Sequence, residues 1–212
     1  MPTTGRDRKS NSYHHGDLRN ALIIAATELI AESGSADFAM VDAARRAGVS
    51  SAAPYRHFKD KDALLEAVCQ LGFLGLAMTS HDIKARHVPG SREAIVAMGK
   101  GYVDYVTSRP QFYDLMWGDH GVRSLEAEQS AMQAGGFYIF VSTVQQWCTA
   151  QGLADNDPLE LAVKLWCMAH GLAGLTMHGQ IERFLDDFNV DALLESSTNT
   201  FLDGLLQKRD GG

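Results

Sequence analysis

The chain has 212 residues, 45% hydrophobic and 21% charged, which is the composition of an ordinary soluble globular protein with room for one large or two small domains. No segment approaches the roughly 18 uninterrupted apolar residues that a membrane span needs, so we expect no membrane partner. The polar start MPTTGRDRKSNSYHHGD lacks the apolar stretch of a secretory signal, and the three cysteines are an odd number in apolar surroundings. These features predict a cytoplasmic protein with reduced cysteines.

The net charge of −7 is unevenly distributed along the chain. The first 60 residues carry a net charge of +1, whereas residues 61–212 carry −8. The location of charge matters more for an anionic partner than its sum. An acidic body would repel DNA and would orient the basic N-terminal part toward it.

A basic arm and a helix come first in chain order. Residues 1–15 have too few apolar groups to offset the entropy of ordering, so we expect a flexible arm. Residues 17–33 place apolar side chains such as Leu22 and Ala26 at helical spacing. Gly34 then closes this helix.

Residues 41–58, VDAARRAGVSSAAPYRHF, are typical of two short helices hinged at a glycine. Val41, Ala44 and Ala47 are apolar at near-helical spacing and predict the buried face of the first helix. Gly48 supplies a backbone conformation with positive φ that ends this helix and turns the chain. The pattern predicts a helix-turn-helix.

The second helix of this pair is expected to face outward. Ser50 is placed to cap it by accepting a backbone N–H. Small side chains follow, which allow close approach to base edges, and polar side chains behind them can hold phosphates. The candidate DNA-binding residues of this region are Arg45, Ser50, Ser51, Ala52, Ala53, Tyr55, Arg56, His57 and Lys59.

Further elements extend this helix-turn-helix on both sides. A helical stretch precedes AARRAGVS, and YRHF and KDKDALL follow it. In this order of elements, residues 13–65 resemble the DNA-binding domain of TetR-type transcriptional regulators. The resemblance implies a DNA-binding domain at residues 16–62 that contacts a double-stranded operator. It also implies a phosphate contact from Lys61, where family members often place a lysine.

Three positions depart from the family pattern. Ala39 stands where a threonine commonly caps the second helix, Ala53 where a threonine is frequent, and Pro54 where an aliphatic residue is usual. Asp37 is the candidate to take over the capping role. Pro54 falls about one turn into the recognition helix, where a missing N–H costs less than it would deeper inside. We expect these departures to affect the operator sequence and to leave DNA binding intact.

Helical patterns dominate the rest of the chain. A long helix, DKDALLEAVCQLGFLGLAMTSHDI, begins at Asp60 and would link the DNA-binding domain mechanically to a body at residues 63–212. Valines and isoleucines are scattered among helix formers, without a convincing alternating strand pattern. The predicted fold class is all-α, with about nine helices.

The segment WCMAHG at residues 166–171 places Trp166 and His170 four residues apart, on one helix face. It resembles the tryptophan–histidine–glycine signature of one type of C-terminal domain in TetR-like regulators, which the segment YHHGDLR at residues 13–19 often accompanies. The resemblance implies a domain for effector binding and dimerisation, with an interface formed by helices at residues 158–179 and 190–207.

Aromatic and methionine side chains in the body favour a cavity for a flat or greasy small molecule. Glycines inside helical patterns, Gly136 among them, indicate either close helix packing or room for such a ligand. In the structural alternative, Trp166 belongs to the core and His170 forms a hydrogen bond across helices. In the ligand-binding interpretation, His170 orients a polar group of an unidentified effector. The candidate effector-binding residues are Tyr105, Met116, Trp117, Phe137, Phe140, Trp166 and His170.

The sequence carries few signs of catalysis or metal binding. Cys167 and His170 are three residues apart, but a second pair at ligand spacing is missing. A nucleophile elbow, a phosphate-binding glycine loop and an HExxH motif are also missing. We therefore expect no cofactor, no metal and no enzymatic activity.

The function predicted is a homodimeric, ligand-responsive transcriptional regulator. A repressor that leaves its operator when a small molecule binds the C-terminal domain is the leading hypothesis. Two alternatives remain open: a small all-α enzyme, and a helical partner-binding protein without DNA affinity.

Overall fold

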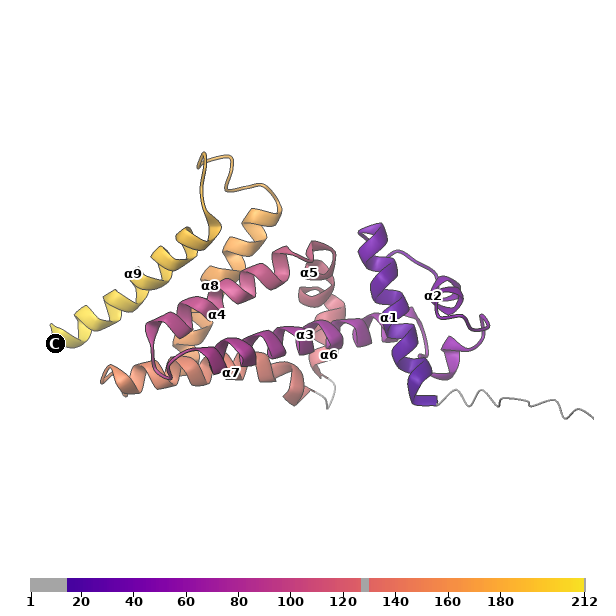
Figure 1. Ribbon diagram of the computed structural model, residues 1–212, viewed down its shortest axis with the longest axis horizontal. Coiled ribbons are helices and arrows are strands. Elements are labelled where there is room, and N and C mark those ends of the chain that lie inside the picture. The colour runs from indigo at the N-terminus through magenta and orange to yellow at the C-terminus, as the bar shows by residue number, and fades with distance from the viewer. Residues whose placement is uncertain (1–14, 127–129, 212) are drawn as a thin grey trace, which may run out of the picture. The chain divides into compact units, whose positions relative to one another are not determined.

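The computed structural model describes residues 15–126 and 130–211, and within those ranges it is built of helices without a strand (Figure 1). This confirms the predicted all-α fold class. The basic arm predicted at residues 1–15 lies, apart from His15, outside the described residues. The helices are α1 (His15–Ser33), α2 (Met40–Arg46), the 3-10 helix η1 (Pro54–Arg56), α3 (Lys61–Arg86), α4 (Arg92–Thr107), α5 (Pro110–Trp117), α6 (Asp119–Glu126), α7 (Ser130–Ala150), α8 (Pro158–Met177) and α9 (Val190–Asp210).

The chain forms two compact units, residues 1–68 and 69–212, and their boundary falls within α3. In the first unit, α1 and α2 pack together. Leu22, Ala26 and Ile30 recur at helical spacing on α1 and are fully buried, and Met40 and Ala43 are buried on α2. These residues form a small apolar core, because the chain has placed one apolar face of each helix against the other.

The first turn of α2 is stabilised without a side-chain cap at Ala39. Instead, the Ala39 backbone N–H donates a hydrogen bond of 2.9 Å to the carboxylate of Asp42, which satisfies one free donor at the helix start. The Asp37 carboxylate lies 3.9 Å from the Lys61 ammonium. The prediction that Asp37 caps α2 is therefore wrong, because an acceptor within the helix already serves its N-terminus.

Arg46 ties α2 to α1. Its guanidinium donates to the Glu32 carboxylate at 2.5 Å and to that of Glu28 at 3.4 Å. The two glutamates lie one turn apart on α1, so both can reach the same cation. Arg46 therefore holds the helix pair together and has a different role from the neighbouring Arg45.

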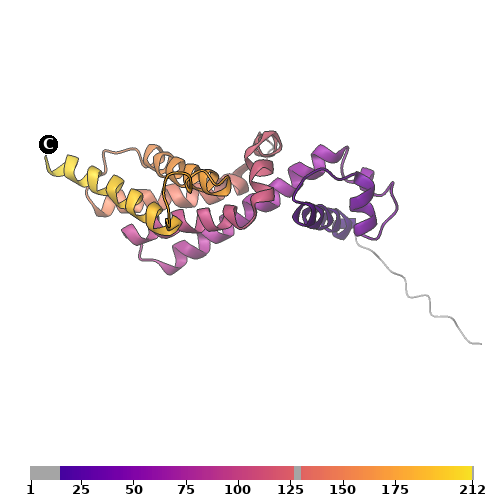
Figure 2. The same ribbon diagram turned by 90° about the horizontal axis from the view of Figure 1, so that it is seen from above.

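The second unit is a helical bundle in which α4, α7, α8 and α9 surround an apolar core. Its fully buried members include Ile95, Val144, Trp147 and Leu202. Helix α8 packs against α4, α7 and α9, and Figure 2 shows α9 running beside it. The core therefore lies where the four helices meet.

Polar residues at the helix starts explain where the bundle helices begin. The Ser91 hydroxyl, the Asp157 carboxylate and the Asn189 amide oxygen accept backbone N–H bonds of 3.2, 2.9 and 2.8 Å at the starts of α4, α8 and α9. Pro158 occupies the first position of α8, where a missing N–H costs little. These residues are start signals that the sequence shows directly.

Two ion pairs join α9 to α4. Arg92 lies 2.6 Å from Asp203, and Lys100 lies 2.7 Å from Glu195. In the fold they help to set the register of α9 against α4.

Helix α3 is long and apolar enough to cross a membrane by length and composition, with a mean hydropathy of 1.5 over its most apolar window. A core helix of a soluble protein passes the same test. Leu64, Leu65, Val68, Cys69 and Phe73 are all buried within the protein. Their burial accounts for the apolar composition of α3, because these side chains are used in packing.

Candidate functional site

The segment after α2 turns sharply and then forms a short 3-10 helix. Gly48 has φ of +70° and ends α2, and η1 follows at Pro54–Arg56. The backbone N–H groups of Ala53, Arg56 and His57 donate to carbonyl oxygens three residues earlier, at 3.0, 3.2 and 2.9 Å. The segment therefore winds more tightly than an α-helix.

The α-helix expected from Ser51 onward is thus replaced by a turn and η1. Pro54 has no N–H and cannot donate to the Ser50 carbonyl, so the first hydrogen bond of an α-helix cannot form there. Ala53 is the N-cap of η1 and makes no side-chain capping bond. The capping role predicted for Ser50 is therefore wrong.

The turn and η1 nonetheless present side chains to solvent. Ser50, Ser51, Ala52, Tyr55 and Arg56 are exposed. Ala53 and His57 are half-buried, while Pro54 and Phe58 are buried and attach the segment to the core. Small side chains at the front of the segment leave room for an edge of a base pair, and Tyr55 and Arg56 behind them can donate to phosphate oxygens.

The remaining candidate DNA contacts differ in how closely their side chains are held by neighbouring residues. The Arg45 side chain is exposed and pairs with Asp42 on the same helix, and Lys59 is exposed beside Asp60. Lys61 is held more firmly, with its ammonium 5.0 Å from the centre of the Phe38 ring and 3.9 Å from Asp37. These two neighbours leave the Lys61 side chain 31% exposed, so its ammonium can also reach a phosphate.

Val41 was predicted to face the core with Ala44, but it is 46% exposed. Met40, Ala43 and Ala44 supply the buried face of α2. Ala44 therefore lies on the buried face as predicted, but Val41 lies about 100° around the helix from Met40 and falls outside that face. Val41 is therefore an exposed apolar side chain near the candidate DNA contacts in sequence.

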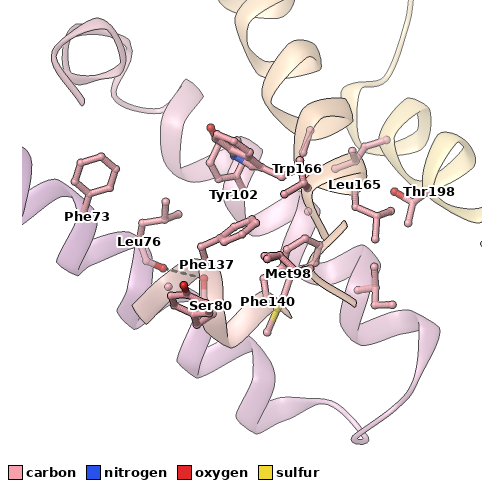
Figure 3. A pocket seen from close by; sticks show the side chains of 18 of the residues that line it. Phe73, Leu76, Ser80, Met98, Tyr102, Phe137, Phe140, Leu165, Trp166 and Thr198 are labelled. Atoms are coloured by element: carbon pink, nitrogen blue, oxygen red, sulfur yellow. Dashed lines mark hydrogen bonds between the residues drawn. The ribbon is translucent and has the colours of Figure 1, made fainter. Parts of the chain in front are cut away.

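The second unit contains a cavity of about 330 Å³. Side chains from α3, α4, α5, α7, α8 and α9 line it. Those labelled in Figure 3 are Phe73, Leu76 and Ser80 from α3, Met98 and Tyr102 from α4, Phe137 and Phe140 from α7, Leu165 and Trp166 from α8, and Thr198 from α9. Its size lies at the lower end of the range for small-molecule sites, and its wall is mostly apolar and aromatic.

Four of the seven candidate effector-binding residues lie on this wall: Trp117, Phe137, Phe140 and Trp166. The other three take different places. Tyr105 donates a hydrogen bond of 2.8 Å to the Gly72 carbonyl, and Met116 is buried with its sulfur close to the same glycine. His170 does not line the cavity, and it forms hydrogen bonds with two tyrosine hydroxyls.

His170 joins three helices by hydrogen bonds. Its Nδ1 lies 2.6 Å from the Tyr102 hydroxyl on α4, and its Nε2 lies 2.9 Å from the Tyr113 hydroxyl on α5. Burial lowers the pKa of His170 below its usual value, which favours the neutral ring. Burial also raises the pKa of Tyr102, so this hydroxyl keeps its proton. The contacts agree with the structural interpretation of His170, a hydrogen bond across helices.

The sequence interpretation missed several wall residues, among them Phe73, Met98 and Tyr102. A usable signal was present for two of them, because Met98 and Tyr102 are large apolar or aromatic residues one turn apart in a helical pattern. Nothing in the local pattern of α3 distinguishes Phe73 from its other apolar residues.

Gly136 has two roles at once. It lines the cavity, and a Cβ added there would lie 3.0 Å from the Ala77 Cα on α3. Gly136 therefore allows α7 to pack closely against α3 and also contributes to the cavity wall, so both interpretations apply to it. Within the described part of the chain, His, Cys, Asp and Glu do not form a cluster of three that could hold a metal ion.

Comparison with known proteins gives matches to both units. Residues 22–68 match the family described as bacterial regulatory proteins, tetR family, and residues 95–201 match the tetracyclin repressor-like C-terminal domain. A curated relative, the HTH-type transcriptional activator FasR of Mycolicibacterium smegmatis, is 29% identical over 113 residues. The match covers 53% of this chain and about half, 51%, of the relative.

Solved structures resemble the chain over most of its length. A protein of unknown function from Rhodococcus sp. RHA1 is 26% identical, with 92% of this chain and 99% of that chain covered and a TM-score of 0.74. A TetR/AcrR-family regulator from Thermobifida fusca YX-ER1 is 22% identical, with 90% and 97% covered and a TM-score of 0.60, and it shows the shared fold. With an N-terminal match, a C-terminal match over half of its residues and this helical architecture, the chain belongs to the TetR family of DNA-binding transcriptional regulators.

Proposed function

We propose that this protein is a cytoplasmic, ligand-responsive repressor that binds an operator as a homodimer. The observation that carries the proposal is the exposed segment from Ser50 to His57, with small side chains in front and Tyr55 and Arg56 behind. The proposed domain organisation is a DNA-binding domain at residues 16–62 and an effector-binding and dimerisation domain at residues 63–212.

The proposed dimer interface lies on α8 and α9. Cys167, Gly171 and Leu175 recur about one turn apart on α8 and are exposed. They border a groove of about 590 Å³ between α8, α9 and the connecting segment, where Phe184 is 83% exposed. Apolar groups of this extent on a soluble protein favour association, and two-fold symmetry brings the same surface of two copies together.

Some apolar residues of the two helices expected to form the interface are instead part of the core. Leu161 and Leu165 are each 4% exposed and belong to the core of the second unit. Leu172 and Leu193 are half-buried beside the groove and remain candidates for the interface. Phe201 and Leu205 pack partly against the core.

Repression is proposed as follows. Two recognition segments related by two-fold symmetry would read half-sites about 34–36 Å apart. Ligand binding in the cavity would favour a conformation with a different spacing, provided that the two conformations bind the ligand unequally. Helix α3 is continuous from the first unit into the second, so a change in the second unit has a covalent path to the first.

Activation is the second candidate function. The observation that favours it is the name of the curated relative, a transcriptional activator that is 29% identical over 113 residues. An activator would bind its site and increase transcription from the adjacent promoter. A repressor would decrease it.

Selection of bound fragments from the source genome tests the proposal. We expect enrichment of short two-fold symmetric sites, and a reporter fused to an enriched promoter distinguishes repression from activation by the sign of the change. Ala52→Lys should then change which site is preferred, whereas Arg56→Ala should weaken binding to all sites similarly. Fragments without a shared motif would contradict sequence-specific DNA binding.

A further inference from the structure

The cavity wall lacks groups that would neutralise a charged ligand. Among the described residues that line it, there is no carboxylate, ammonium, guanidinium or imidazole group. Moving a charged group from water into a cavity with such a wall is strongly unfavourable unless an opposite charge or several hydrogen bonds stabilise it there. The wall therefore selects against carboxylates, phosphates and amines.

Two polar groups on the wall already have partners. The Ser80 hydroxyl donates to the Leu76 carbonyl at 3.0 Å, a bond visible in Figure 3. The Tyr102 hydroxyl lies 2.6 Å from His170 Nδ1. Neither group needs a ligand to satisfy it.

The indole of Trp117 is different. Its Nε1 is buried and has no hydrogen-bond partner. The ring packs among Phe73, Trp166 and His170, at centroid distances of 5.3, 5.4 and 5.3 Å. Both His170 nitrogens are engaged by tyrosine hydroxyls, so this neighbour offers no acceptor.

An unpaired buried donor destabilises the site until an acceptor reaches it. Trp117 also lines the cavity, so a ligand that spreads the surrounding rings can bring an acceptor to its N–H. A cation would gain from the aromatic faces but would leave this donor unpaired. The unpaired N–H therefore points to an acceptor.

We propose that the cavity takes an uncharged, largely apolar molecule that carries a hydrogen-bond acceptor, such as an aryl ketone or ester, and that Trp117 Nε1–H donates to this acceptor. The volume of about 330 Å³ fits a compact molecule of two or three rings. This inference rests on the proposed function in one respect: binding of the ligand in this cavity would be the signal that releases the protein from DNA.

Four naphthalenes with the same ring system test the ligand class on the full-length protein by isothermal titration calorimetry. They are 2-acetylnaphthalene, 2-ethylnaphthalene, 2-naphthoate and trimethyl(2-naphthyl)ammonium. The acetyl compound should bind about tenfold more tightly than the ethyl compound, and about 100-fold more tightly than either ion. Tighter binding of either ion, or no binding of any of the four, would overturn the proposal.

Trp117→Phe tests the donor. This variant keeps an aromatic ring but removes the N–H, so the preference for acetyl over ethyl should disappear. Trp166→Phe is the matched control, since it removes the other indole of the same wall, and it should weaken both compounds equally. An acetyl preference that survives in Trp117→Phe would rule out the assigned donor.

A spectroscopic readout on the unmodified protein covers the case in which Trp117→Phe does not fold. The carbonyl stretch of bound 2-acetylnaphthalene should shift to lower wavenumber than in hexane, as expected of a hydrogen-bonded ketone. A stretch at the hexane position would overturn the proposal.

Operator affinity, measured with and without 2-acetylnaphthalene, separates the two proposals. Selective binding without any change in DNA affinity would leave the cavity assignment standing and would contradict ligand-responsive regulation.

Discussion

His170 illustrates how a single buried ring can hold a bundle together. Each of its two ring nitrogens forms a hydrogen bond with a tyrosine hydroxyl, one from α4 and one from α5. Its ring also stacks on the Tyr113 ring, with the ring centroids 5.2 Å apart. Because burial lowers its pKa, the ring is neutral in the folded protein at neutral pH. Its part in ligand binding would be indirect, through Tyr102 on the cavity wall.

The lowered pKa of His170 makes stability depend on pH. The unfolded chain binds a proton near the ordinary value of 6.5, and the folded chain does so only at lower pH. The stabilising contribution is therefore present above about pH 6.5 and is lost as the pH falls through the folded-state pKa. His170→Gln keeps a donor and an acceptor but cannot titrate.

We expect the melting temperature of the unmodified protein to fall, relative to that of His170→Gln, as the pH is lowered from 8 to 5. Differential scanning calorimetry of both proteins at each pH checks this, because other titrating groups cancel in the difference. A difference that does not change with pH would contradict the assignment.

Lys61 is the residue for which we expect a defined contribution to DNA affinity. Its ammonium is held by Phe38 and Asp37 at the start of α3. Lys61→Ala should weaken operator binding and reduce the slope of log affinity against log salt by about 0.9, as expected for one lost phosphate contact. Fluorescence anisotropy over a salt series measures both quantities.

Lys164→Ala is the control for this experiment. It removes the same charge from α8 in the second unit, where Lys164 pairs with Glu160. Its slope should match that of the unmodified protein. An unchanged slope for Lys61→Ala would show that Lys61 does not contact a phosphate.

At the scale of elements, glycine sets how closely helices approach. Gly136 on α7 and Gly99 on α4 both line the cavity, but their neighbours differ. A Cβ at Gly136 would meet the backbone of Ala77, whereas a Cβ at Gly99 would meet the end of the flexible Leu194 side chain at 3.3 Å. A backbone cannot move aside as a side chain can.

Gly136→Ala should therefore destabilise the protein by about 1–3 kcal/mol, the usual cost of overpacking. Gly99→Ala should be neutral or stabilising by up to about 1 kcal/mol, since alanine is the better helix former. Urea unfolding of the two variants gives both values. Equal effects would mean that α7 and α3 have room to separate.

Pro54 shows that one residue can change the type of an element. By removing an N–H one turn into the expected recognition helix, it leaves a turn and a 3-10 helix in place of an α-helix. The exposed side chains are retained in spite of this change. The directions in which successive side chains point differ from those in an α-helix, because a 3-10 helix has about three residues per turn.

For the whole molecule, the uneven distribution of charge and apolar surface agrees with the two proposed contacts. Residues 61–212 carry a net charge of −8, whereas residues 1–60 carry +1 and include the exposed small and basic side chains of the recognition segment. Exposed apolar groups on α8 and the segment before α9 remain without a partner in a single copy, within the part of the chain that the structure describes. A second copy would bury them.

Leu175→Asp tests this interface. Leu175 is 50% exposed, so the substitution places a charge on the proposed interface without entering the core. We expect sedimentation velocity at micromolar concentration to show a dimer for the unmodified protein and a monomer for the variant. Val88→Asp, at a position 73% exposed, is the control and should remain dimeric. A monomeric unmodified protein would refute the interface.

Much of the architecture could be predicted because its signals are local. Helical spacing, Ser91, Asp157 and Asn189 at helix starts, and Gly48 at the end of α2 act through neighbours a few residues away. The all-α class and the position of the recognition segment depend on such signals. The sequence by itself therefore determined where α4, α8 and α9 begin, where α2 ends, and which segment turns outward.

Tertiary structure decided which aromatic residues line the cavity. Tyr102 and Tyr105 lie on the same helix, yet Tyr102 is on the wall and Tyr105 donates to Gly72 on α3. Periodicity places both on the inner side of α4 but does not say which helix each one meets. That depends on how closely α3, α7 and α8 approach, which is set by contacts between residues far apart in the chain, such as Gly136 against Ala77.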